Sequence, residues 1–338
     1  MKWPAAPSFV FLSGRSCGLA VLALSLLVAP SVRAEDAAPC RGSYLLYRNA
    51  ASAISFDKSA DLTYNPYYAM TFQFSPRWWF GKYVGLSADI DITREITEAD
   101  DTTRNGEWWL GDVQAGVAGR APTIPWVGID AMAKVSVLAP TSKISQARTL
   151  ILGLKPELTL ARTFPLLSGL TVAYVLQGTR FLNEYTTSQR EVPLIPGCAA
   201  GLGGCDRFVN IGLRNAEWRM VNALALSLDV FPWLGISADA AIVVDWLYAQ
   251  EELDAQVSFE PQEGTDQRYT MAYSLEVYGK PMPSVGLALG MSTVNPQLKP
   301  DSTPHEPFVN RYTTVYFDVR FHIDGFIAQL RNPGGNNE

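Results

Sequence analysis

A segment near the C-terminus alternates hydrophobic and polar residues without a break, and this alternation limits what the chain can fold into. In residues 315–324, VYFDVRFHID, hydrophobic residues occupy the odd positions and mostly charged or polar ones the even positions. Successive side chains of a β-strand point to opposite faces, so this strand has one apolar and one polar face. A second protein layer must cover the apolar face in a soluble sheet, whereas lipid covers it in a membrane barrel.

Segments with the same period of two recur along most of the chain. They are residues 62–74, 83–96, 107–120, 127–137, 152–162, 170–182, 218–230, 235–246, 268–278 and 285–292. Strands of globular proteins usually have about 5–6 residues, whereas a tilted membrane strand needs about 9–11. The lengths of these segments therefore favour strands that cross a bilayer.

The connections between the segments are of two kinds, which take turns along the chain. Short connections rich in proline and aromatic residues are residues 76–80, 122–126, 164–168, 231–233 and 280–284. Long polar connections are residues 98–106, 139–146, 184–214, 250–267 and 295–311. Short periplasmic turns that alternate with long outer loops are typical of outer-membrane barrels.

Aromatic residues gather at both ends of the predicted strands. Those at the short turns are Trp78, Trp79, Trp126, Phe164, Phe231 and Trp233, and those at the other ends are Trp108, Trp109, Trp218, Trp246, Tyr248, Tyr269 and Tyr312. Two aromatic belts fit the two interfaces of a membrane. The alternative is that the rings cap a soluble core. A poorly alternating segment at residues 42–47 supplies a first strand, so that we expect an antiparallel barrel of about twelve strands.

The last strand resembles the C-terminal strand of Gram-negative outer-membrane β-barrels, with Phe317, Phe321 and Ile323 on the predicted lipid face. The resemblance is to this broad class and implies contact with outer-membrane lipid and with the barrel assembly machinery. Such chains usually stop at a terminal aromatic residue, whereas this one continues. We expect residues 62–324 to form the barrel, after an N-terminal periplasmic segment and weak first strand at 35–61, and residues 325–338 to form a polar tail.

The N-terminus reads as a secretory signal peptide. Lys2 and Arg15 precede an apolar run at residues 19–28, and residues 32–34, VRA, form a small-residue cleavage site. We expect cleavage after Ala34 and location in the cell outer membrane. Because the exported compartment is oxidising, we also expect a Cys198–Cys205 disulfide, with Cys40 left over or in competition.

Motifs for catalysis are nearly absent from the sequence. The one G-x-S-x-G lies in the predicted signal peptide, at residues 14–18, and the chain has only 2 histidines. We expect no enzyme activity, no cofactor and no metal site. The formal net charge of −6 argues against nucleic acid as a partner.

The polar face of the predicted strands carries more acids than bases. The acids are Asp89, Asp91, Glu95, Asp112, Asp130, Glu157, Asp229, Asp239, Asp245, Glu276 and Asp318, and the bases are Lys134, Lys155, Arg219, Arg268 and Arg320. A water-filled lumen with this surplus would favour cations. Small inward residues leave room for a passage: Ala118, Ala161, Ala173, Ala223, Ala225, Ala241, Ala272 and Ala288.

Two functions remain open on this evidence. The first, which we favour, is a narrow channel or porin-like transporter for small polar or cationic solutes. The second is a non-conducting barrel that binds partners through its long loops. The pairing of the five basic residues with carboxylates distinguishes the two functions. In a plugged barrel each base should lie against a carboxylate, whereas in a channel the bases should line a water-filled path. A soluble exported β-protein is a minor third possibility.

Overall fold

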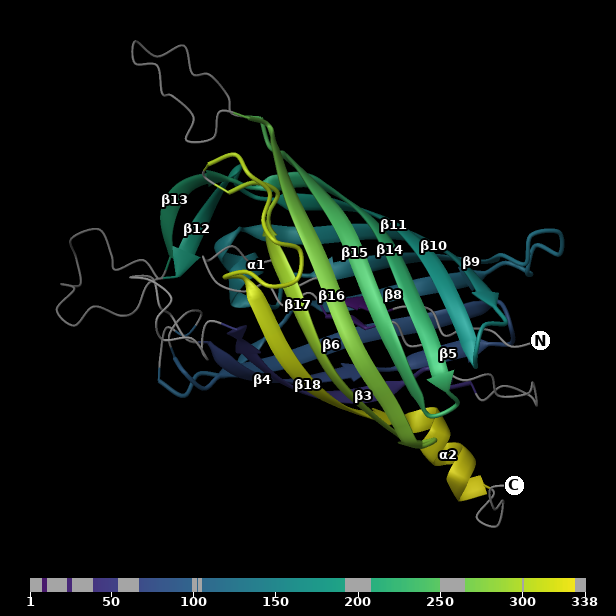
Figure 1. Cartoon of the computed structure of the whole chain (residues 1–338). Coiled ribbons are helices and arrows are strands. Elements are labelled where there is room, and N and C mark those ends of the chain that lie inside the picture. The colour runs from purple at the N-terminus through teal and green to yellow at the C-terminus, as the bar shows by residue number, and fades with distance from the viewer. Residues whose placement is uncertain are drawn as a thin grey trace, which may run out of the picture.

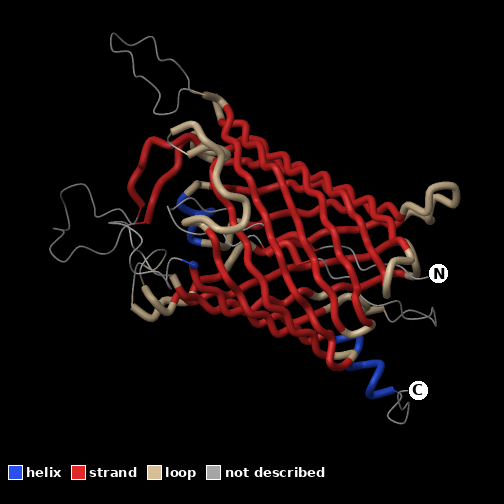
Figure 2. Tube along the Cα trace, in the orientation of Figure 1, coloured by secondary structure: helices blue, strands red, loops and turns tan. Residues whose placement is uncertain are grey.

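The computed structural model describes residues 8–10, 23–25, 39–53, 67–98, 102, 105–191, 208–249, 265–299 and 301–331. These residues form one large antiparallel sheet that closes on itself as a barrel, seen from the side in Figures 1 and 2. Its strand segments are β3 (Tyr44–Ser52), β4 (Tyr68–Ser75), β5 (Arg77–Phe80), β6 (Val84–Glu95), β7 (Trp109–Leu110), β8 (Val113–Arg120), β9 (Asp130–Ala139), β10 (Leu150–Phe164), β11 (Gly169–Asn183), β14 (Ala216–Phe231), β15 (Leu234–Leu247), β16 (Gln267–Met282), β17 (Val285–Pro296) and β18 (Thr313–His322).

The 14 segments of the sheet make 12 barrel strands because two strands are interrupted. β4 and β5 both pair with β6 and are separated only by Pro76, which has no N–H to donate to a ladder. β7 and β8 also both pair with β6, with Gly111 and Asp112 between them. The predicted number of strands is therefore confirmed.

The first and last strands close the barrel. β18 pairs with β3 from Thr314 opposite Ser52 to His322 opposite Tyr44. β3 pairs on its other side with β4, so the weakly alternating first strand is real and longer than residues 42–47. Its alternation is poor because Leu46 and Ala50 occupy the inward face, where polar residues were expected.

The two faces of the strands separate as the alternation predicts. Large apolar side chains such as Leu86, Val135, Ile242 and Leu289 are exposed on the outer surface. Most inward positions are buried, including all eight of the alanines expected there. A closed barrel satisfies the backbone hydrogen bonds of every strand between neighbours and leaves no free sheet edge.

The connections place all the short turns at one end of the barrel and the long connections at the other (Figure 1). We call these the short-turn end and the long-loop end. The long-loop end carries helix α1 (Lys143–Ala147) and a hairpin of β12 (Thr187–Glu191) and β13 (Phe208–Arg214). The side of the membrane that each end faces stays a prediction.

The C-terminal segment differs from the predicted polar tail. The strand expected over residues 315–324 ends at His322, and helix α2 (Ile323–Arg331) follows. At the end of the ladder, the His322 and Ile323 amides donate to the carbonyls of Ser284 and Ser43. Asp324, in the first turn of α2, accepts hydrogen bonds from the amides of Gly42 and Gly325, so side-chain bonds fix the start of the helix.

The N-terminal residues that the structure describes form two short strands, β1 (Ser8–Val10) and β2 (Ala23–Ser25), which pair with each other. β2 also contacts β16. Most of the predicted signal peptide lies outside the described residues, and its cleavage stays a prediction. Neither helix within the described residues is long and apolar enough to cross a membrane.

Candidate pore lining

The predicted lining residues fall on the inward side of the barrel. Strand alternation fixes the side of all of them except Asp112, which lies between β7 and β8. They are Asp89, Asp91, Asp112, Asp130, Lys134, Lys155, Glu157, Arg219, Asp239, Asp245, Arg268, Glu276, Asp318 and Arg320. They do not form one cluster. The register of the strands sorts them into separate groups on the wall.

One group lies on the wall made by β4, β6, β8, β9 and β10. Asp89 accepts a hydrogen bond of 2.8 Å from the Ser75 hydroxyl and lies 3.6 Å from the Lys134 ammonium. Lys134 is directly opposite Glu157 in the ladder. Lys155 donates to the Gln114 side-chain oxygen at 3.2 Å. Acids and bases thus alternate along this wall.

Two further acids of this wall are held by backbone and loop groups. The Asp91 carboxylate lies over Gly111, where a Cβ atom would collide with it. Asp112 accepts hydrogen bonds from the Ser142 amide at 2.9 Å and from the Ser145 hydroxyl. Ser142 is the N-cap of α1, so Asp112 holds this helix to the inner wall at the long-loop end.

A second group lies on the wall of β14, β15 and β16 near the long-loop end. Arg219 makes two hydrogen bonds to the Asp245 carboxylate, at 2.6 and 2.8 Å. The two residues are opposite each other in register, so the pair is bidentate and well aligned. Arg268, from the next strand, donates to the Arg214 carbonyl at 2.9 Å.

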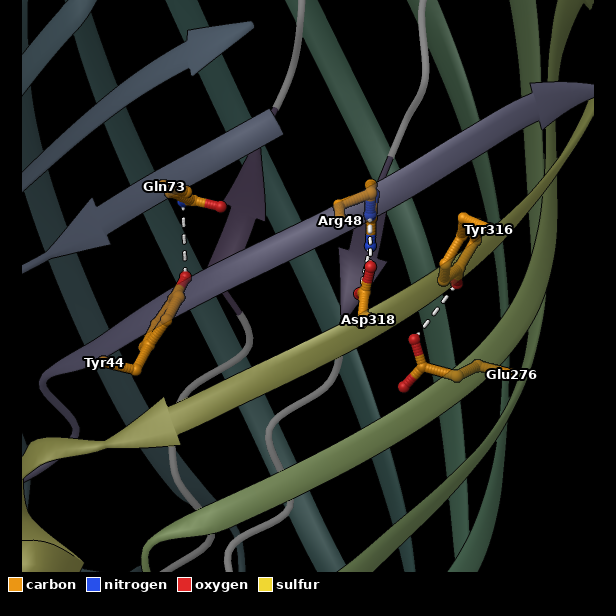
Figure 3. A network of polar contacts seen from close by, with 6 residues as sticks. All are labelled: Tyr44, Arg48, Gln73, Glu276, Tyr316 and Asp318. Carbon is orange, nitrogen blue, oxygen red and sulfur yellow. Dashed lines mark hydrogen bonds and ion pairs between the residues drawn. The ribbon is translucent and has the colours of Figure 1, made fainter. Parts of the chain in front are cut away.

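The third group joins the closing strands and is drawn in Figure 3. Arg48 makes hydrogen bonds of 2.6 and 2.5 Å to Asp318, directly opposite it across the β3 and β18 pair. The Arg48 guanidinium also lies 4.1 Å from the centre of the Tyr316 ring. The Tyr316 hydroxyl donates to Glu276 at 3.1 Å. In the same view, Gln73 donates to the Tyr44 hydroxyl at 3.4 Å.

The remaining predicted residues have simpler surroundings. Asp130 accepts from the Thr123 hydroxyl at 2.5 Å, and Asp239 accepts from the Ser274 hydroxyl at 2.8 Å. Arg320 lies with its guanidinium 5.6 Å from the centre of the Tyr44 ring. Of the five predicted bases, Lys134 and Arg219 form ion pairs with carboxylates. The other three contact an amide, a carbonyl and a ring, and each also has a carboxylate that interacts with it electrostatically: Glu157 for Lys155, Asp245 for Arg268 and Glu276 for Arg320.

Sequence reasoning missed several inward basic residues. Arg48 was overlooked because the first strand alternates poorly, although a closed barrel with β18 beside β3 would have placed it opposite Asp318. Arg77 and Arg120 were overlooked because they lie beside the short turns, where the alternation ends. These arginines reduce the excess of inward acidic residues over inward basic ones. The expected cation preference depended on that excess.

The inner wall also has an apolar part that the sequence reading did not single out. Val175, Val221 and Val243 lie on adjacent inward positions of β11, β14 and β15 and pack with small alanines. The lumen is thus lined by polar side chains over most of its wall and by apolar ones over a patch of it.

The predicted Cys198–Cys205 disulfide lies outside the described residues, and Cys40 is a free thiol. No three His, Cys, Asp or Glu side chains within the described ranges come together as a metal site. His305 lies in the last long loop, where partial burial and the nearby cations Lys299 and Arg311 lower the pKa of its imidazole. The ring packs edge-on against Tyr312, with 5.3 Å between ring centres.

No protein-family model matches the sequence, and no curated protein matches it by sequence similarity. Solved structures do match in fold. An outer membrane channel from Pseudomonas putida F1 superposes with a TM-score of 0.50 at 10% identity, over 86% of this chain and 98% of that chain. The NanC porin superposes with a TM-score of 0.43 at 10% identity, over 82% of this chain and 100% of that one. With twelve antiparallel strands closed into a barrel, the chain has the fold of the Gram-negative outer-membrane β-barrels.

Proposed function

We propose that the mature protein is a narrow channel for small polar solutes in the outer membrane. The observation that carries this proposal is the inner wall, on which charged and polar side chains are distributed around a closed barrel of twelve strands. Barrels of about eight strands are filled by side chains, and those of 16–18 leave a wide channel. A twelve-strand barrel with alanines at many inward positions fits a narrow passage between these cases.

The outer surface supports location in a membrane. Large apolar side chains are exposed around the barrel, and a soluble protein rarely exposes so continuous an apolar band. A lipid bilayer accounts for this band without a second protein layer. The fold match to a known outer membrane channel supports the outer membrane in particular. Insertion there by the barrel assembly machinery is part of the proposal.

The N-terminal residues bear on whether the passage is open. β2 contacts β16, and Figure 3 shows the two N-terminal strands among the barrel strands. Cleavage after Ala34, as the sequence predicts, would remove both strands. The experiment therefore uses the mature chain, residues 35–338.

The test is the conductance of the refolded mature chain in a planar bilayer. Heat-modifiable migration in a gel first establishes that the barrel is folded. We expect steady single-channel openings. Their conductance should be low because side chains from all walls narrow the lumen. Folded, inserted protein that carries no current would refute the channel proposal.

A second candidate function is a plugged barrel that binds partners through its long loops. The ion pairs Arg219 with Asp245 and Arg48 with Asp318 favour it, because paired charges can fill a lumen. The same conductance measurement separates the two, since a plugged barrel is silent. Binding to the outer loops would then be sought with the hairpin of β12 and β13 removed.

A further inference from the structure

Four arginines gather at the short-turn end of the barrel around two aromatic rings. We call them the basic belt: Arg41, Arg77, Arg120 and Arg320. Arg77, Arg120 and Arg320 are inward residues of β5, β8 and β18, and Arg41 lies in the turn before β3. The belt thus follows a continuous arc of the wall, from β18 through β3 to β8.

The rings hold the guanidinium groups in place. Those of Arg41 and Arg120 lie 4.6 and 4.3 Å from the centre of the Trp79 ring. Trp79 is itself fixed, because its indole lies over Gly85 and its Nε1 donates to the Arg41 carbonyl at 3.2 Å. The guanidinium of Arg77 lies 6.0 Å from the centre of the Tyr44 ring, on which Arg320 also lies. Stacking on aromatic faces orients guanidinium groups without neutralising them.

Among the described residues, Arg320 is buried without a hydrogen-bond partner. Its side chain is 7% exposed and makes no hydrogen bond or ion pair within the described part of the chain. Its Nε is buried without a hydrogen-bond acceptor, and so is the Nε of Arg41. The Glu276 carboxylate interacts with Arg320 electrostatically but accepts no hydrogen bond from it. An anion that enters the site would supply the hydrogen bonds that the guanidinium lacks.

The carboxylates of this end are already engaged by other donors. Asp130 accepts from the Thr123 hydroxyl, and Asp324 accepts from two backbone amides that start helix α2. Asp229 accepts from the Tyr278 hydroxyl at 2.6 Å. These neutral donors leave the carboxylates charged, but none of the three forms an ion pair with Arg41 or Arg320 within the described residues.

We propose that the basic belt is a binding site for small anions that carry a carboxylate or a phosphate group. Both groups match the fork of a guanidinium and accept two hydrogen bonds from it. In the channel, on whose existence this part of the proposal rests, the belt makes the short-turn end prefer anions. This preference is opposite to the one that the count of charges in the sequence favours.

The test compares the mature protein with Arg320→Gln and Arg41→Gln. The matched control is Arg162→Gln, because Arg162 lies at the same end of the barrel but faces outward, over the Phe164 ring at 4.7 Å. Binding of inorganic phosphate, and separately of acetate, to the folded barrel in detergent is measured by calorimetry at low salt. Reversal potentials in a potassium chloride gradient are measured on the same variants.

We expect Arg320→Gln to weaken binding of phosphate or acetate about tenfold, as loss of about 1.4 kcal/mol would do, and to shift the reversal potential toward cation preference. Arg162→Gln should change neither. The anion-binding proposal would be refuted if the parent protein bound neither anion, or if Arg320→Gln and Arg41→Gln left binding unchanged. This holds even if the channel conducts. Binding that these variants weaken in a barrel without conductance would keep the site and refute the channel.

Discussion

At the scale of single residues, a glycine in one strand of the wall leaves room for a tyrosine side chain to extend across that strand. Glu276, Gly290 and Tyr316 are in register on β16, β17 and β18, and the Tyr316 ring lies over Gly290 to reach Glu276. Asp229, Gly235 and Tyr278 repeat the arrangement on β14, β15 and β16. Alternation predicts that these tyrosines point inward. The acid that each one reaches depends on strand register, which the sequence alone does not provide.

We therefore expect Gly290→Ala to destabilise the barrel. A Cβ atom there would lie 2.6 Å from the Tyr316 hydroxyl end and 2.9 Å from the Leu275 carbonyl, so the ring must leave Glu276. Overpacking of this kind costs about 1–3 kcal/mol. The control is Gly119→Ala, since no atom lies within 4 Å of the Cβ position there. Urea unfolding of the two variants in lipid vesicles measures the difference, and equal midpoints would show that the ring adjusts freely.

The pair of Arg48 and Asp318 gives a second residue-scale prediction. Both side chains are nearly fully buried, at 6% and 1% exposure. Removal of one partner of a buried pair typically costs about 3–5 kcal/mol because the other charge is stranded. We expect Arg48→Ala to reach this range and the double variant with Asp318→Ala to be more stable than Arg48→Ala alone. A double-mutant cycle in urea tests it; additive effects would mean that water solvates each charge separately.

At the scale of elements, the period of two predicted where strands lie but not where they break or stop. The break between β4 and β5 follows from Pro76, which the sequence shows. The start of α2 at Ile323 depends instead on bonds to Gly42, Ser43 and Ser284, which are distant in sequence. Helix α1 depends likewise on Asp112, which precedes the neighbouring strand β8 and lies 30 residues before Ser142 in the sequence. Local patterns cannot supply contacts of this kind.

Helix α2 is expected to lie in the membrane interface at the short-turn end. Ile323, Phe326, Ile327 and Leu330 recur at the spacing of one helical face, and the Phe326 ring contacts outward Phe321 with 5.3 Å between centres. The apolar face of α2 thus continues the outward apolar side of β18. In a chain whose native cysteines are changed to serine, a spin label at Leu330→Cys should be more accessible to dissolved oxygen than to a water-soluble nickel reagent. A label at Ala328→Cys, on the opposite face, should show the reverse, and equal accessibility at the two positions would place α2 in water.

At the scale of the whole molecule, the prediction of the barrel depended mainly on the requirement for an even number of strands. Short turns that alternate with long loops require an even number of strands when both termini lie at one end, and this forced a first strand that its own sequence hardly supports. The structure confirms twelve strands because β3 has a partner on each side. The arrangement of charges on the inner wall was less predictable. It depends on which acids and bases the register places side by side, as it does Arg48 and Asp318, and that is a property of the assembled wall.

Closure of the barrel between β3 and β18 can be tested directly by cross-linking. Asn49 and Phe317 are opposite each other in register, and opposite residues of an antiparallel pair have Cβ atoms about 4.5–5.5 Å apart. In a chain without native cysteines, Asn49→Cys with Phe317→Cys should form a disulfide on mild oxidation. Ala51→Cys with Phe317→Cys is the control, because it joins diagonal neighbours on the same face, about 7–8 Å apart. The cross-linked barrel should unfold at a higher temperature, since the bond joins the first strand to the last and constrains the unfolded chain. Equal cross-linking of the two pairs would mean that the closing register slips, and no cross-link in either would mean that the barrel closes elsewhere.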